Sequence, residues 1–320
     1  MLAQWIRCTW VLIFIIVLQI FPASAAGNRG EFLLKENGDY FGHDLLTKKK
    51  VSLDQCKSTC LKNLGCVAFT YNKSAKFCFL KSDFDEIKFF EGAVAGRLVK
   101  PGLKSDIGAP PKLLFVPAFI HERAVKFRTQ LITKKKQVEG LGFNALSEGA
   151  KERLLDGNII AASLYLSTAL KINPDHQQSW NALSDAANRY QSDNSTQTRI
   201  FRNTATSAAL NGYLLSRTKQ SRAQALTNLA RGLEAEKRFR PALTAYQRSL
   251  ALVEITEVRG EFNELRRTHG FRVVNHTIDS DNLSPRVCVQ FSEKLRTKSA
   301  GYEDFLSVNN GAPKAIDVKA

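Results

Sequence analysis

Four cysteines packed into one short stretch constrain this chain more than any other feature of its sequence. The stretch runs from Cys56 to Cys78 and holds four of the six cysteines. Cys56 and Cys60 stand four residues apart, the spacing that places two side chains on one face of a helix. Ser52, three residues before Gln55, adds a capping-box pattern at the start of that helix.

The residues after Gly65 predict a β-hairpin. The run 67–71 is typical of a strand, 72–74 of a turn, and 77–80 of the returning strand. A helix joined by two disulfides to a small sheet is the simplest arrangement that uses all four thiols. Spacing alone leaves all three cysteine pairings open.

Residues 31–98 resemble the PAN/Apple module, a small disulfide domain of secreted and surface proteins. The resemblance rests on four motifs: Asp39-Tyr40-Phe41-Gly42, the Cys56 and Cys60 pair, Cys66 followed by Ala68-Phe69-Thr70-Tyr71-Asn72, and Cys78-Phe79-Leu80-Lys81. It implies the disulfides Cys56–Cys78 and Cys60–Cys66. The third bridge of the full Apple pattern has no cysteines here, so we expect the ends of the module to be loosely held.

Such a module binds protein or carbohydrate ligands. We expect exposed aromatic and basic side chains to make the contacts, and the candidates are Tyr40, Tyr71 and Lys81.

The N-terminus predicts export. Residues 11–20 are apolar but short for a membrane span, and Ala23-Ser24-Ala25 is a small-residue cleavage site. We interpret residues 1–25 as a cleaved signal peptide, and an uncleaved membrane anchor is the alternative. Either places the remaining chain in an oxidising compartment, periplasmic or extracellular, where paired cysteines persist.

The formal net charge of +16 is compatible with a nucleic acid partner, an anionic surface or plain solubility. Export argues against nucleic acid, and so does the lack of aromatic residues interleaved with the basic ones. The densest basic runs are 48–50 and 134–136. Each is either a solvated element end or a contact for anionic glycans or lipid headgroups.

Residues 99–118 contain many prolines and glycines, which indicates a linker between domains. The region 119–269 is expected to be all-helical, with 119–137 as one basic helix. Small and aromatic residues in two segments follow a tetratricopeptide-like pattern, and a generic helical bundle is the alternative. These residues are Gly157, Ala161, Ala162, Tyr165, Ala169, Leu170 and Pro174 in the first segment, and Phe239, Ala242, Ala245, Tyr246, Ser249 and Leu250 in the second.

After residue 270 the hydrophobic periodicity changes to that of β-strands, in 271–278 and 286–291. We therefore expect residues 270–320 to be the start of a β-sandwich domain. This part resembles the N-terminal region of bacterial alpha-2-macroglobulin family proteins. The resemblance rests on Gly270–Val273, Asp279–Asp281, Pro285–Leu295 and Asp304-Phe305. The family implies a periplasmic protease trap, with proteases as partners. No Cys-Gly-Glu-Gln thioester motif is present, so the chain resembles only the front part of such an inhibitor.

Catalytic motifs are absent from the sequence. There is no H-E-x-x-H metal pattern, no G-x-S-x-G elbow, no phosphate loop and no dinucleotide fingerprint, so we expect no enzyme activity, metal or cofactor. Cys288 has no partner once the signal peptide is removed. It is interpreted as a small buried hydrophobe, with a disulfide to a residue outside this chain or a nucleophile as the alternatives.

The expected fold is therefore multidomain α+β. A PAN/Apple module at 27–98 precedes the linker, the helical region and a partial macroglobulin-like domain. The expected function is an exported, non-enzymatic binding protein that takes protein or carbohydrate through the PAN module. The alternative is a truncated endopeptidase inhibitor of the alpha-2-macroglobulin type.

Overall fold

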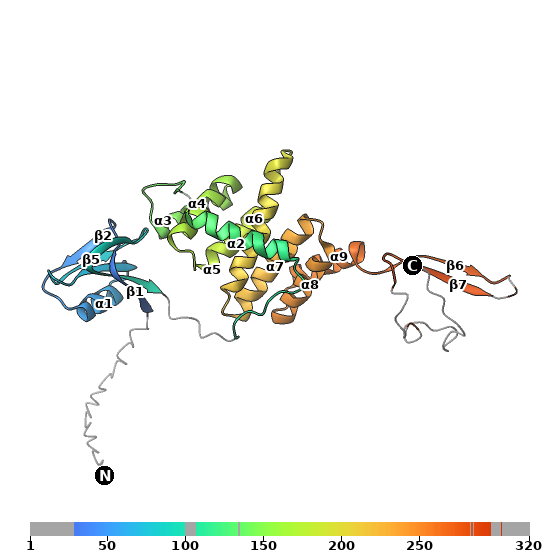
Figure 1. The fold of residues 1–320 in the computed structure, drawn as a ribbon, viewed down its shortest axis with the longest axis horizontal. Helices are drawn as coiled ribbons and strands as arrows, with labels where there is room; N and C mark the ends of the chain where they lie inside the picture. The colour runs from blue at the N-terminus through green and yellow to red at the C-terminus, as the bar shows by residue number, and fades with distance from the viewer. Residues whose placement is uncertain are drawn as a thin grey trace, which may run out of the picture.

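The computed structural model describes residues 29–99, 107–133, 135–281, 283, 285–295 and 302. The interpreted signal peptide, residues 100–106 of the linker, Lys134 and the Asp304-Phe305 motif lie outside these residues. Along the described chain, a small sheet domain is followed by a layer of helices and then by a β-hairpin (Figure 1). None of the helices in the described ranges is long and apolar enough to cross a membrane.

The sheet domain is one antiparallel sheet of five strands in the order β1-β5-β3-β4-β2. Its strands are β1 (Glu31–Asp39), β2 (Asp44–Lys48), β3 (Ala68–Asn72), β4 (Phe77–Lys81) and β5 (Lys88–Val99). The predicted hairpin is β3 and β4, paired in register from Ala68↔Lys81 to Asn72↔Phe77. The first and last strands, β1 and β5, lie side by side.

Helix α1 (Leu53–Lys62) covers one face of this sheet. The predicted capping box is present, because Ser52 and Gln55 exchange hydrogen bonds between side chain and backbone. Cys56 and Cys60 are both buried against the sheet. The disulfides Cys56–Cys78 and Cys60–Cys66 join the helix to the hairpin, in the pairing that the resemblance implies.

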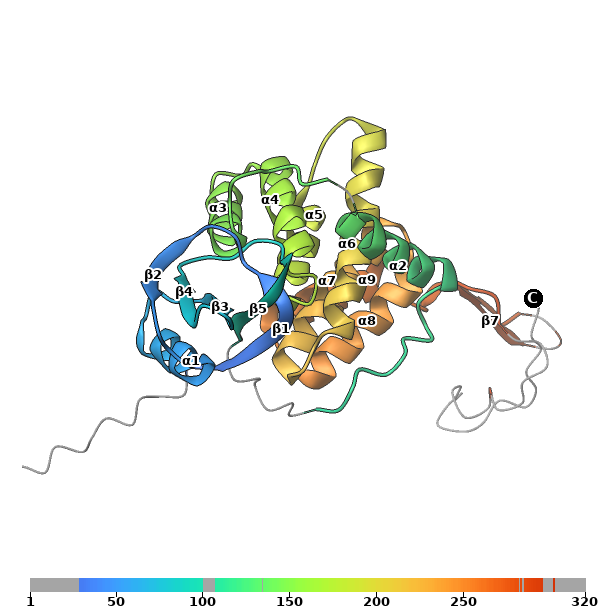
Figure 2. The same cartoon turned by 60° about the vertical axis from the view of Figure 1, so that its left-hand side comes forward.

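The helical layer contains α2 to α9, and most consecutive helices in it pack against each other. The helices are α2 (Ala118–Thr133), α3 (Phe143–Leu155), α4 (Ile159–Ile172), α5 (Gln177–Arg189), α6 (Ser195–Leu214), α7 (Lys219–Ala235), α8 (Phe239–Leu252) and α9 (Thr256–His269). Helix α2 lies against α6 (Figure 2) and also contacts α4. Most of the residues of the tetratricopeptide-like pattern are buried in the hydrophobic clusters, as with Ala169 in α4 and Ala242 in α8, whereas Gly157 is exposed.

The second half of the expected linker is part of this layer. Leu113 and Val116 are buried in its main hydrophobic core. Tyr213 donates a hydrogen bond to the carbonyl oxygen of Pro111, and Arg222 to that of Gly108. Residues 107–117 form no helix or strand, and several of them pack on the helical layer, so this part of the expected linker between domains belongs to the second of them.

The other face of the sheet packs against α3 and α4. One hydrophobic cluster joins Tyr40, Phe84 and Ala95 of the sheet domain to Phe143 and Leu146 of α3, together with Ala169 of α4. The rings of Phe84 and Phe143 are stacked with their centroids 5.2 Å apart. The sheet is therefore the middle of three layers, with α1 on one face and α3–α4 on the other.

Asp83 connects these layers electrostatically. Helix α3 begins after Gly142, which has no side chain to cap it. The buried Asp83 carboxylate, which lies just after β4, instead accepts hydrogen bonds from the backbone N–H groups of Asn144 and Ala145 at 2.9 and 3.0 Å. A carboxylate at this place is favoured by the unpaired N–H groups and the positive end of the helix dipole. A Cβ at position 142 would lie 2.4 Å from the Asp83 carboxyl carbon, so this approach requires glycine.

Two further ion pairs lie beside Asp83. Asp85 pairs with Lys136, and Glu86 pairs with Lys171 at 3.2 Å. Lys136 belongs to the basic run 134–136. Its side chain pairs with Asp85 of the same chain, so it is neither a solvated element end nor a free contact for anionic glycans or lipid headgroups.

The C-terminal hairpin consists of β6 (Val273–Asp279) and β7 (Arg286–Phe291). Ile278 and Val287 are paired across the ladder, and both are exposed. Cys288 follows Val287 and so points to the opposite face, where it is exposed as well. The interpretation of Cys288 as a buried hydrophobe is therefore wrong, because the described residues place no second layer on this hairpin.

The Asp83 cap gives a test of the joint between the layers. We expect Asp83→Ala to lower the free energy of unfolding by about 1–2 kcal/mol, the usual cost of losing a helix N-cap. Urea denaturation followed by helical circular dichroism measures this change. Asp156→Ala is the matched control, since Asp156 is exposed at the opposite end of α3, where a negative charge is unfavourable. Equal losses in both variants would contradict the capping role.

Candidate functional site

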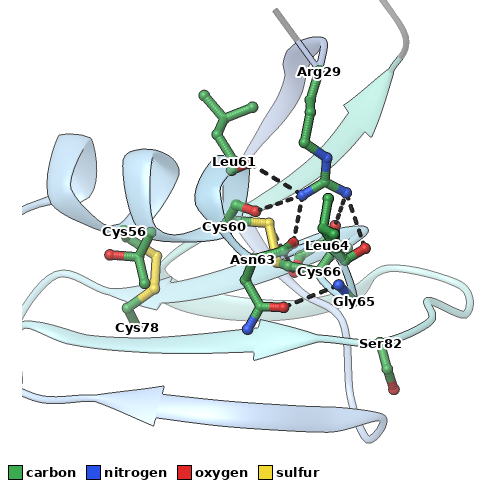
Figure 3. The surroundings of a disulfide bond; sticks show 12 residues. Arg29, Cys56, Cys60, Leu61, Asn63, Leu64, Gly65, Cys66, Cys78 and Ser82 are labelled. Carbon is green, nitrogen blue, oxygen red and sulfur yellow. Dashed lines mark hydrogen bonds between the residues drawn. A yellow bond between two sulfur atoms is a disulfide. The ribbon is translucent and has the colours of Figure 1, made fainter. Parts of the chain in front are cut away.

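Arg29 holds the end of α1 and the loop that follows it. Its guanidinium donates hydrogen bonds to five backbone carbonyls in this part of the chain (Figure 3). They are those of Cys60 at 3.1 Å, Leu61 at 3.2 Å, Asn63, Leu64 at 3.1 Å and Cys66 at 3.3 Å. Carbonyls at a helix C-terminus lack backbone partners and favour a cation. Arg29 therefore supplies hydrogen bonds to the turn around the Cys60–Cys66 disulfide that the backbone does not supply.

The ends of the sheet domain are joined by backbone pairing. The ladder between β1 and β5 starts at Glu31↔Val99, at the two ends of the domain. With the hydrogen bonds of Arg29, this ladder joins the two ends of the domain in place of the absent third disulfide. The expected looseness of these ends stays a prediction.

The structure buries all three candidate contact residues. The ring of Tyr40 is 5% exposed, packs on Phe84 and lies between sheet and helices, where burial raises the pKa of its hydroxyl. Tyr71 donates its hydroxyl hydrogen bond to the backbone oxygen of Val51 at 2.9 Å. Lys81 is 3% exposed and pairs with Asp44 at 2.7 Å. The prediction of exposed contacts at these residues is wrong, because the docked helices and the protein's own polar groups take up these side chains.

The module instead exposes an aromatic patch, which we define as Phe41, Ile87, Phe89 and Phe90. The register pairs Gly38 with Phe89 and Asp39 with Lys88, so residues 87–90 run beside the end of β1 that leads to Phe41. Phe41 is 67% exposed and Phe89 is 79% exposed. These side chains lie on neighbouring segments but not all on one face, since Phe89 and Phe90 are consecutive in β5 and point to opposite sides. Exposed apolar side chains of this size mark candidate interaction sites.

Cations border the aromatic patch. The ammonium of Lys88 lies 4.6 Å from the centroid of the Phe41 ring, within the range of a cation–π contact. Lys35 is exposed, and its side chain lies next to Gly38. Exposed carboxylates border the patch as well, because Glu86 precedes Ile87 and Glu91 follows Phe90. The patch is thus apolar with charges of both signs around it.

A charged cluster in the helical layer has a structural explanation. Arg231 of α7 binds Glu261 of α9 through two nitrogens, at 2.7 and 2.9 Å. Tyr246 of α8 donates to Glu261 at 2.9 Å and lies 3.3 Å from Glu234. Burial acts to raise the pKa of Glu261, but the hydrogen bonds and charge of Arg231 outweigh it and hold the pKa below its usual value. These mutually satisfied groups join three helices.

Metal-binding groups are not gathered anywhere in the described parts of the chain, which contain no cluster of three or more histidine, cysteine or carboxylate side chains suited to a metal ion.

Comparisons with known proteins address the two larger parts separately. No curated protein matches the chain. Three solved structures that match the helical part each cover 39% of this chain: the first TPR of Spaghetti (RPAP3) bound to an HSP90 peptide (17% identity, 90% of that chain, TM-score 0.34), the Arabidopsis OM64 TPR domain (13%, 95%, 0.33) and the N-terminal domain of stress-induced protein-1 from C. elegans (12%, 94%, 0.32). The family model described as the PAN domain matches residues 31–94. This match agrees with the helix, the hairpin and both disulfides described above, so residues 31–94 are a PAN domain.

Proposed function

We propose that this chain is an exported, non-enzymatic binding protein whose PAN domain binds a partner protein through the aromatic patch. PAN domains in general bind protein or carbohydrate. The observation that carries the choice is the exposure of Phe41 and Phe89 on adjacent chain segments. Two disulfides in so small a domain support export, because such bonds persist in oxidising compartments.

The chemistry of the patch favours a protein over a carbohydrate. Its four defining side chains are hydrocarbon, whereas a sugar presents hydroxyl groups that need several convergent hydrogen-bonding partners. Aromatic anchors surrounded by polar residues are typical of protein interfaces. Charged side chains of both signs at its border, Lys88 and Glu91 among them, form the polar surroundings that such anchors usually have.

In this proposal the helical layer holds the PAN domain in a fixed orientation. Burial of one sheet face against α3 and α4, with the Asp83 cap and the adjacent ion pairs, fixes the orientation of the domain. The same burial removes this sheet face from the surfaces available to a ligand. The aromatic patch lies outside the buried contact and stays open.

The test replaces the patch while preserving the fold. Phe41→Ser/Phe89→Ser should abolish capture of proteins from the extracellular fraction of the source by the immobilised chain, as measured by mass spectrometry of the eluate. Leu64→Ser is the matched control, because Leu64 is 85% exposed on the same domain just after α1 and does not belong to the patch. The control should capture the same proteins as the unmodified chain.

A glycan array probed with the unmodified chain, the double variant and the Leu64→Ser control tests whether the ligand is a carbohydrate. Glycan binding that survives the double substitution would overturn the assignment to the patch, as would equal capture by the double variant and the unmodified chain.

A second candidate function rests on the C-terminal hairpin. Strands β6 and β7 expose apolar side chains on both faces, and an isolated two-stranded hairpin is marginally stable in water. Further strands that cover it would make it the opening of a β-sandwich. This supports the proposal that the chain is the front part of a protease inhibitor of the alpha-2-macroglobulin type.

The native mass distinguishes the two candidates. An antibody against residues 27–100 should detect, in the source, a band several times heavier than 35.7 kDa if the hairpin opens a larger inhibitor. A band at or slightly below 35.7 kDa would contradict the inhibitor proposal and leave the PAN domain as the binding unit.

A further inference from the structure

Four exposed lysines at one end of the PAN domain play no part in the proposed function. They are Lys48 at the end of β2, Lys49 and Lys50 after it, and Lys76 in the turn between β3 and β4, and we call them the lysine patch. Within the described ranges their ammonium groups form no ion pair, since the ion pairs of this domain belong to other lysines. Lys49 lies 5.3 Å from the centroid of the Phe77 ring, a contact that does not neutralise its charge.

The backbone holds the lysine patch together. Lys48 lies opposite Cys78 in the ladder between β2 and β4, and the disulfide of Cys78 fixes this part of the sheet. The N–H group of Val51 donates to the backbone oxygen of Lys76 at 3.1 Å, which joins the chain after Lys50 to the turn. Four like charges are therefore kept close together, and they repel one another in the folded protein.

Two of these lysines have a backbone conformation that lysine rarely adopts. The φ angles of Lys50 and Lys76 are 57° and 54°. This left-handed region favours glycine or asparagine over other residues. Lysine at both positions costs free energy and gains no ion pair within the described parts of the chain. Such strain is typical of positions that serve a function.

The carboxylates on this side of the domain do not neutralise the lysine patch. Asp54, in the first turn of α1, pairs with Lys57 at 3.2 Å, and Glu36 pairs with Lys73. Glu36 and Glu91 belong to β1 and β5, which β3 and β4 separate from β2 in the sheet. The edge of the sheet that carries the lysine patch is therefore positive.

We propose that the lysine patch docks on the surface of a membrane that contains anionic phospholipids. The patch is made of lysine alone, and a lysine ammonium is a point charge without the rigid hydrogen-bonding fork with which arginine recognises one particular anion. All four side chains are exposed, so they meet a ligand at an open surface. Unfixed charges on an open surface suit the mobile phosphates of a lipid layer better than the fixed pattern of a single anionic molecule.

Cosedimentation of the purified chain with lipid vesicles tests the proposal. We expect binding to vesicles of phosphatidylcholine mixed with phosphatidylglycerol, and none to vesicles of phosphatidylcholine alone. Raising the salt from about 0.1 M to about 1 M should release the chain, because the screening length falls from about 10 Å to about 3 Å. The triple variant Lys48→Gln/Lys49→Gln/Lys50→Gln should bind the mixed vesicles about a hundredfold more weakly, which is about fivefold for each lysine.

The matched control removes the same charge elsewhere. Lys35→Gln/Lys112→Gln/Lys126→Gln changes three exposed lysines outside the lysine patch and should weaken binding severalfold at most. Arginine in place of the three lysines of the patch should preserve binding. Circular dichroism checks that every variant is folded.

Three results would overturn the proposal. The first is absence of binding to the mixed vesicles at low salt, and the second is an equal loss of binding in the two glutamine variants. The third is binding to soluble dextran sulfate that is tighter than binding to the vesicles at equal charge concentration, which would assign the lysine patch to a polysaccharide.

Discussion

The architecture of this protein depends on the burial of both faces of one small sheet. A single helix with two disulfides covers the first face, and α3 with α4 covers the second. A domain of this size has a thin core when it stands alone, so the second layer adds apolar contact that the disulfides cannot supply. Asp83 makes the contact specific, because a helix without a cap of its own receives its carboxylate from the sheet domain. The approach is close enough to require glycine at position 142.

Local patterns in the sequence correctly predicted the parts of the fold that local forces determine. The capping box at Ser52, the burial of Cys56 and Cys60, and the hairpin from Ala68 to Lys81 follow from spacing, side-chain chemistry and β propensity. The all-helical region expected in 119–269 is likewise present as α2 to α9, and the helix expected at 119–137 is α2, Ala118–Thr133. Strands β1, β2 and β5 escaped detection, because they carry charged and glycine residues and are defined by pairing with distant segments.

The candidate site, in contrast, could not be predicted from local sequence patterns. Tyr40 and Lys81 are residue types that often lie at the surface. Tyr40 is buried because the helices dock on it, and Lys81 is buried where it pairs with Asp44. Phe41 and Phe89 are residue types that usually lie in a hydrophobic core, yet both are exposed. The consecutive Phe89 and Phe90 at a strand end were a usable signal, since consecutive residues point to opposite faces and this domain is too small to bury both.

The cap supplied by Asp83 also has a consequence for the order of folding. Asp83 lies five residues after Cys78, whose disulfide fixes the hairpin that leads to it. Chains fold domain by domain as they emerge, N-terminal part first. In an exported chain that folds in this order, the PAN domain would present α3 with a ready carboxylate and an apolar surface. Oxidation of two cysteine pairs would then precede the assembly of helices α2 to α9, which contain no cysteine.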